Sequence, residues 1–229
     1  MERRVEPEVM DDPGLDPGLH AEALDALARI NRVSLTERRL ADEVVQVATR
    51  RAGPVRVLDV GCGDAAVVVE AARRAGRRGV TVEPHGCDTS PVALSRARAR
   101  AARAGIPLRL SRVNVPEDPL PGGFDVATCS LFLHHLDEAD AVRLLSAMAQ
   151  AARIVLVQDL RRTRAGLVLA WLGVRLLSRS SVARVDGPRS VRAAFSLDEV
   201  AGLARRAGLT GATVRRAWPQ RLVIRWEAA

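Results

Sequence analysis

The chain has 229 residues, of which 48% are hydrophobic and 27% are charged, and this suits one α/β domain with its own core rather than a disordered chain. Its 35 basic residues, all arginine, give a formal net charge of +8, but they are interleaved with acids and form no basic stripe. Three Phe, three Trp and no Tyr leave few rings for stacking on bases, so nucleic acid is not expected as a partner.

The cysteines indicate the redox environment. Cys62, Cys87 and Cys129 are an odd number without metal-ligand spacing, which argues against a disulfide framework and against a metal site. A reducing cytoplasm is therefore the expected location. The first residues contain no apolar run, so no secretory signal is expected. The most apolar segment, residues 167–177, contains Arg175 and is too short to cross a bilayer.

The first part of the chain predicts an arm and two helices. Residues 1–18 contain several prolines and acids and are expected to form an irregular arm. Apolar residues at helical spacing follow between positions 24 and 30. A second helix is predicted at 36–51, with Thr36 as its N-cap.

From Val55 the pattern alternates between short apolar runs and helices rich in Ala and Arg, which is typical of βα repeats around a parallel sheet. Strands are predicted at 55–60, 79–87, 108–113, 124–130 and 153–158, with helices at 65–75, 91–104 and 137–151. The last third predicts an apolar helix at 165–178, a polar loop around Asp186, Gly187 and Pro188, a helix capped by Ser196 that ends at Arg206, and strands at 209–217 and 220–226.

These elements predict an α/β fold of the Rossmann-like kind. Its sheet has seven mostly parallel strands with helices on both faces, an N-terminal helical extension and a helical lid after strand five. Residues 1–50 are expected to form the arm and first helices of the same unit, residues 51–229 the main domain, and residues 160–195 the lid. Open α/β folds bind their ligands at the carboxyl edge of the sheet, so the site is expected there.

A glycine turn follows the first strand of this sheet. Gly61 and Gly63 come at the end of a buried strand and before a helix, where glycine permits positive φ angles and close approach of a cofactor. Asp59 precedes them; a carboxylate there repels a pyrophosphate but suits a cofactor that carries an ammonium and a sulfonium. Asp88 closes the second strand, where an acid accepts hydrogen bonds from ribose hydroxyls. An adenosine cofactor is therefore predicted.

A dinucleotide remains an alternative from these residues. Gly61, Gly63 and Ala66 also satisfy the G-x-G-x-x-G/A pattern, and Asp88 would serve the ribose of NAD equally well. An NAD-dependent oxidoreductase is accordingly a rival hypothesis, against which Asp59 counts.

Three segments carry a more specific resemblance: VLDVGCGDA at 57–65, GCDTSPVALSRAR at 86–98 and FDVATCSLFLHHL at 124–136. Over residues 50–160 the chain resembles the class I, Rossmann-like S-adenosylmethionine-dependent methyltransferases. The resemblance implies that Gly61 and Gly63 approach the methionine part, that Asp59 orders its amino end, and that S-adenosylhomocysteine is the product. Asn114 stands where the family commonly has an Asp for the adenine amino group. The expected cofactor-binding residues are Asp59, Gly61, Cys62, Gly63, Asp88, Thr89, Asn114, Val115 and Ser130.

Two histidines are candidates for catalysis. His134 and His135 follow the fourth strand at the ligand-binding edge of the sheet, and an imidazole suits proton removal near neutral pH. The alternative for either histidine is a local role, in capping the next helix or in packing.

The last third indicates the kind of acceptor. The leucines and Trp171 of the helix at 165–178 favour an apolar or aromatic acceptor, and the same helix is equally suited to core packing. The segments QDLRRT and DGPRSVRAAFSLDEV are similar to small bacterial methyltransferases of polyketide or phenolic secondary metabolism. Polar residues there are expected to orient the acceptor or to fix the lid: Asp159, Arg161, Asp186, Ser190 and Arg192.

The leading hypothesis is O- or C-methylation of a small aromatic or polyketide-like acceptor. An RNA or protein methyltransferase and a cofactor-binding protein without methyl transfer are the alternatives. The sequence leaves the acceptor, the methylated atom and the oligomeric state open.

Overall fold

The computed structural model describes residues 1–12, 14–115 and 117–228; positions 13, 116 and 229, which fall within the predicted ranges 1–50 and 51–229, lie outside the described residues. Its centre is a seven-stranded sheet with the order β3-β2-β1-β4-β5-β7-β6. The strands are β1 (Val55–Val60), β2 (Val82–Asp88), β3 (Arg109–Arg112), β4 (Phe124–Ser130), β5 (Ala152–Leu160), β6 (Thr213–Ala217) and β7 (Arg221–Glu227). The first five are parallel, and β7 is antiparallel to β5 and to β6. The predicted seven-stranded, mostly parallel α/β fold is confirmed.

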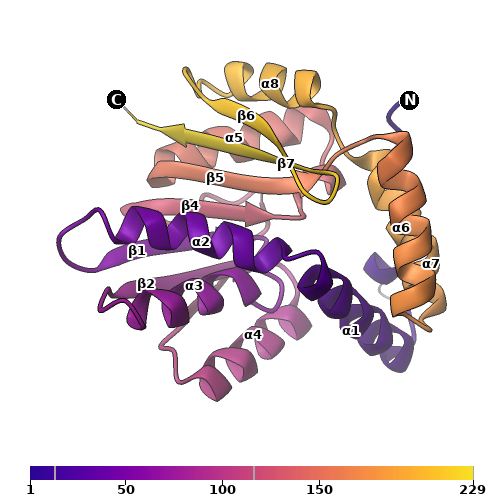
Figure 1. Cartoon of the computed structure of the whole chain (residues 1–229), viewed down its shortest axis with the longest axis horizontal. Helices are drawn as coiled ribbons and strands as arrows, with labels where there is room; N and C mark the ends of the chain where they lie inside the picture. Colours follow the sequence, from indigo (N-terminus) through magenta and orange to yellow (C-terminus); the bar gives the residue numbers. More distant parts are fainter. Residues whose placement is uncertain (13, 116, 229) are drawn as a thin grey trace.

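Helices cover both faces of the sheet (Figure 1). One face packs against α2 (Thr36–Ala48), α3 (Ala66–Gly76) and α4 (Pro91–Ala104), and the other against α5 (Glu138–Ala151) and α8 (Leu197–Arg206). Strand side chains alternate between the faces: Val57 belongs to the first core and Leu58 to the second. Both faces are therefore buried, as a parallel sheet requires.

Three helices form a cover at one end of the sheet, α1 (Pro17–Val33), α6 (Arg164–Leu177) and α7 (Ser181–Ala193). They pack on one another. The N-terminal arm, which includes the short helix η1 (Val9–Asp11), crosses α7: the backbone amides of Val9 and Met10 donate to the Asp186 carboxylate at 2.9 and 3.1 Å. The arm is thus held by a residue far away in the sequence.

Two local predictions are wrong. The polar loop expected around Asp186, Gly187 and Pro188 is the middle of α7. A Cβ on Gly187 would lie 2.6 Å from a Val174 methyl carbon, and Asp186 is 2% exposed, so tertiary contacts decide the conformation where the local Gly-Pro signal suggested a turn. Thr36 is not an N-cap, because Leu35 occupies that position with a φ of 54°.

We expect Leu144→Ala to lower the free energy of unfolding by about 2–5 kcal/mol, because it removes a side chain from a closely packed core and leaves a cavity. Leu144 is 0% exposed and lies in α5. The matched control is Leu172→Ala in α6, where the leucine is 42% exposed and the loss should stay within about 0.5 kcal/mol. Urea unfolding measures both, and similar losses would contradict the assigned core.

Candidate functional site

The glycine turn between β1 and α3 is shaped by left-handed backbone. Gly61 has a φ of +62° and Gly63 a φ of +54°. A Cβ on Gly61 would lie 2.8 Å from Cγ of Phe132, whereas a Cβ on Gly63 would meet nothing within 4 Å. Gly61 is therefore needed for a close contact within the chain, and Gly63 leaves open space above the turn.

Asp59 provides a buried carboxylate below this turn. It is 2% exposed, and the Thr128 hydroxyl donates to it at 2.6 Å. Burial raises the pKa of Asp59 to about 7, and the charges of Asp88 and Asp64 add to this rise. Among the described residues no arginine forms an ion pair with Asp59. A buried carboxylate with one neutral donor fits a bound ammonium group, which supplies the missing charge.

Asp88 joins the turn to the next helix. One carboxylate oxygen accepts from the Gly63 amide at 2.9 Å and the other accepts from the Ser90 amide at 2.9 Å. Each oxygen keeps a further acceptor position. Asp88 therefore fixes the turn and the start of α4, and still fits two ribose hydroxyls.

The other expected cofactor residues lie at the same edge of the sheet. Cys62 is buried and its sulfur packs against Gly86: a Cβ on Gly86 would lie 2.8 Å from Sγ of Cys62. Asn114 donates its side-chain amide to Glu117 at 2.6 Å, which leaves its oxygen as an acceptor. The remaining positions differ in exposure: Thr89 is exposed, Val115 is buried and Ser130 is half-buried. The glycine turn is thus hydrogen-bonded to Asp88, whereas the Asn114 side chain is hydrogen-bonded only to its neighbour Glu117 among the contacts described.

All three cysteines are free and buried. Burial raises the pKa of Cys87 to about 12 and raises the pKa values of Cys62 and Cys129 further. A reactive thiolate is thereby disfavoured, and the cysteines serve as small core residues.

His134 is held by a buried carboxylate. It lies in the short helix η2 (Leu133–His135) after β4 and is 4% exposed. Its Nδ1 is 2.6 Å from Oδ1 of Asp159, and its backbone amide donates to Oδ2 at 3.0 Å. Burial alone would raise the pKa of Asp159, but the charge and hydrogen bonds of His134, with the amide of Leu160, hold that pKa below its ordinary value. Asp159 thus fixes the orientation of the ring and leaves Nε2 pointing away from it.

His135 and Glu8 complete this part of the site. The His135 ring stacks on Phe132 with centroids 6.0 Å apart and lies 4.4 Å from the His134 ring. Glu8 comes from the N-terminal arm; its Oε1 is 3.8 Å from Nε2 of His134 and accepts from the Ser190 hydroxyl at 2.5 Å. Phe132 therefore links the glycine turn to the histidines.

A cavity of about 370 Å³ lies beside these side chains. It is lined by arm residues 5–8, His134, His135 and Ala193. Sequence reasoning missed Glu8, Thr128 and Phe132 as parts of the site. The place of Phe132 between strand four and the histidines was a signal that could have been used, but nothing in the sequence marks Glu8.

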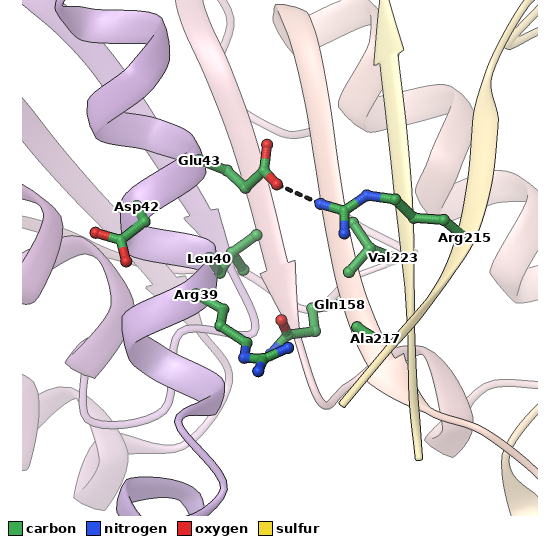
Figure 2. Close-up of a pocket in the computed structure, with 8 residues that line it drawn as sticks. All are labelled: Arg39, Leu40, Asp42, Glu43, Gln158, Arg215, Ala217 and Val223. Atoms are coloured by element: carbon green, nitrogen blue, oxygen red, sulfur yellow. Dashed lines mark hydrogen bonds and ion pairs between the residues drawn. The ribbon is translucent and has the colours of Figure 1, made fainter. Parts of the chain in front are cut away.

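A second hollow, of about 200 Å³, lies between α2 and strands β5, β6 and β7. Figure 2 shows Glu43 of α2 facing Arg215 of β6 across it, and the two form an ion pair. Asp42 pairs with Arg74, and the Arg39 guanidinium lies 5.5 Å from the Trp218 ring. None of the predicted site residues lines this hollow, so we regard it as a surface groove rather than a candidate site.

Comparisons with known proteins agree with this geometry. Residues 57–154 match the family described as a methyltransferase domain. The chain is 34% identical over 161 residues to a ubiquinone biosynthesis O-methyltransferase of Bordetella parapertussis, which covers 67% of this chain and 61% of that protein. It is 30% identical over 164 residues to the Ralstonia nicotianae enzyme of the same name, with coverages of 70% and 65%. The chain thus spans less than two thirds of these curated relatives.

Solved structures share the fold. The S-adenosylmethionine-dependent methyltransferase SibL superposes with a TM-score of 0.67 at 22% identity, covering 93% of this chain and 60% of that one. An O-methyltransferase family 2 protein of Planctomyces limnophilus, in complex with apigenin, has a TM-score of 0.66 at 18% identity, with coverages of 95% and 63%. The plantazolicin methyltransferase BpumL, with a substrate analog and S-adenosylhomocysteine, has a TM-score of 0.68 at 12% identity, with coverages of 93% and 90%.

The strand order of the sheet and the glycine turn after β1 together define a class I methyltransferase fold. Residues 57–154 match the methyltransferase-domain family, and the chain has the fold of Rossmann-like, S-adenosylmethionine-dependent methyltransferases. This likeness favours S-adenosylmethionine over a dinucleotide as the adenosine cofactor.

We expect Gly61→Ala to weaken S-adenosylhomocysteine binding by about tenfold or more, because the new methyl group strains a positive-φ position and displaces Phe132. The control is Gly79→Ala, which has a φ of +70° but meets nothing within 4 Å. That variant shares the backbone strain and should keep its affinity. Isothermal titration calorimetry measures both, and equal affinities would remove Gly61 from the site.

The affinity for S-adenosylmethionine should rise by up to about tenfold from pH 6 to pH 8. Asp59, with a pKa of about 7, is mostly protonated at the lower pH and ionised at the higher one, and the cofactor ammonium favours the ionised form. Asp59→Asn should bind more weakly at pH 8 and lack this rise. The amino group of the ligand ionises in the same way in the experiments on both proteins. Identical pH dependences of the affinity would therefore contradict the pairing of Asp59 with the cofactor ammonium.

Proposed function

We propose that this chain transfers the methyl group of S-adenosylmethionine to a hydroxyl oxygen of a small apolar, aromatic or polyketide-like acceptor. The match of residues 57–154 to a methyltransferase domain and the name of the curated relatives support O-methylation. The observation that carries the proposal is the buried His134–Asp159 pair beside a cavity at the carboxyl edge of the sheet. Such a pair is suited to removing a hydroxyl proton.

The cofactor would be held by the residues around the glycine turn. Asp59 would pair with the ammonium of the methionine part, and Asp88 would accept from the ribose hydroxyls, in keeping with their free acceptor positions. Asn114 would receive the adenine amino group through its oxygen. When bound, the cofactor supplies a methyl group that its sulfonium has already activated.

His134 would act as the general base. Asp159 accepts a hydrogen bond from Nδ1–H of the ring, so Nε2 would carry the lone pair that takes the proton of the acceptor hydroxyl. The acceptor oxygen would gain the methyl group as the bond from the methyl carbon to sulfur breaks, with S-adenosylhomocysteine as the leaving group. The Asp159 carboxylate then stabilises the imidazolium. His135, which stacks on Phe132 and lines the same cavity, would hold the acceptor against the glycine turn, where alignment contributes much of the rate.

The lid helix contributes less apolar wall than its sequence suggested. Leu167 packs inward in a small cluster with Leu160 and Leu131, but Val168, Leu169, Trp171 and Leu172 are exposed. Apolar contact with the acceptor is therefore assigned to Phe132, which stacks on His135 beside the cavity. Among the described residues, no helix is long and apolar enough to cross a membrane. A place in bacterial secondary metabolism and in the cytoplasm is part of this proposal.

The experiment is turnover of the full chain with S-adenosylmethionine and a panel of phenols and hydroxyquinones, followed by mass spectrometry of the products. We expect an O-methylated product from at least one aromatic acceptor. Methylation of RNA or protein alone would contradict the proposal. Cofactor binding without any methylated product would favour the non-catalytic alternative.

In this assay His134→Asn should lower kcat by about 10²–10⁴-fold, since it removes the proposed base, and Asp159→Asn should lower it by about tenfold or more. Affinity for S-adenosylhomocysteine should not change in His134→Asn, because this side chain does not belong to the proposed cofactor contacts. His20→Asn in α1 serves as the control and should keep full activity. If His134→Asn turns over normally, alignment alone must suffice and the base assignment is wrong.

A further inference from the structure

Three side chains that commonly bind metals converge beside the cavity. The ligand atoms of Glu8, His134 and His135 all lie within 4.8 Å of one another. The side chain of Glu8 is 8% exposed and that of His134 is 5% exposed. The cysteine spacing predicts no metal site, whereas this cluster joins the arm to the segment after β4.

The histidine is already oriented as in a metal site. Metal-binding imidazoles usually donate their second N–H to a carboxylate, which fixes the tautomer and directs the other nitrogen at the ion. Asp159 supplies this partner for Nδ1 of His134 at 2.6 Å. Nε2 then presents its lone pair toward Glu8, whose oxygen is 3.8 Å away. Ligand atoms about 2.0–2.2 Å from a tetrahedral ion are about 3.4 Å apart, and the distance from Glu8 to His134 is close to that spacing.

The charge and chemistry of the cluster favour a particular kind of ion. The carboxylate of Glu8 is largely buried and is bonded to the neutral hydroxyl of Ser190, and a buried carboxylate is stabilised by a cation. Two imidazoles and one carboxylate suit Zn²⁺ and similar borderline ions, whereas Mg²⁺ and Ca²⁺ prefer oxygen ligands throughout. The adjoining cavity offers space for a fourth ligand such as water.

We propose that Glu8, His134 and His135 bind one Zn²⁺ ion, with Asp159 as the carboxylate that orients His134. The ion fastens the N-terminal arm to η2 and so closes the cavity. It also occupies the Nε2 lone pair of His134. This second consequence rests on the proposed function: where His134 is the base, bound Zn²⁺ inhibits methyl transfer.

Binding is tested on the full chain after treatment with a chelator, by calorimetric titration with Zn²⁺ alone and by absorption spectroscopy with Co²⁺. We expect one ion per chain. Glu8→Gln should weaken the binding by at least about tenfold, and Asp159→Asn by about 10–100-fold, the usual effect of removing such a partner. The matched control is Glu6→Gln. Glu6 lines the same cavity and pairs with Arg189, and its variant should bind Zn²⁺ like the unmodified chain.

Folding and function are separated from binding in two further measurements. Each variant is checked by circular dichroism and by S-adenosylhomocysteine affinity, so that a loss of Zn²⁺ binding in a folded variant is assigned to the cluster. Absence of one-to-one binding, or equal Zn²⁺ affinity in Glu8→Gln and Glu6→Gln, would overturn the site. Binding without inhibition of methyl transfer supports the metal site but refutes His134 as the base.

Discussion

The arrangement of the site depends on one buried carboxylate, that of Asp159 in the last parallel strand. It accepts hydrogen bonds from the ring and the backbone amide of His134 and from the amide of Leu160. Removing such an acceptor would leave several buried donors without a partner, at a cost of about 1–3 kcal/mol each. The carboxylate therefore fixes η2 relative to β5. The two histidines, and Phe132 before them, take their positions from it.

The cover over the site is built on this fixed segment. Arg3 of the arm donates to the carbonyl oxygens of Leu136 and Ala193 at 2.6 and 2.7 Å, and its guanidinium lies 3.7 Å from the centre of the Phe195 ring. Asp186 of α7 holds the arm a few residues further along. Arm, lid and η2 are thus one connected unit, and Glu8 reaches the histidines because both ends of its segment are fastened.

The sequence predicted what depends on local pattern. Short apolar runs between helical segments located all seven strands. The turn containing Gly61 predicts a cofactor site at the carboxyl edge of the sheet, because open α/β folds bind their ligands there. The misassigned α7 shows the limit of this reasoning: Gly187 lies within a helix because it packs on Val174, a contact that no local signal records. Glu8 was missed for the same reason, since its partners are distant in sequence and only the folded chain brings them together.

The crossing of the arm over α7 also determines an order of events in folding. Residues near the start of the chain receive their partners, among them Asp186, Ser190 and Ala193, from a segment that the ribosome adds much later. Contacts between residues so distant in sequence favour slow folding, because the loop between them must be closed before the contacts form. The five parallel strands and the glycine turn precede α7 in the chain, so they are available for assembly before the arm has its partners. Arm residues 5–8 and Ala193 line the same cavity, so the cavity is complete only when the arm has docked on α7.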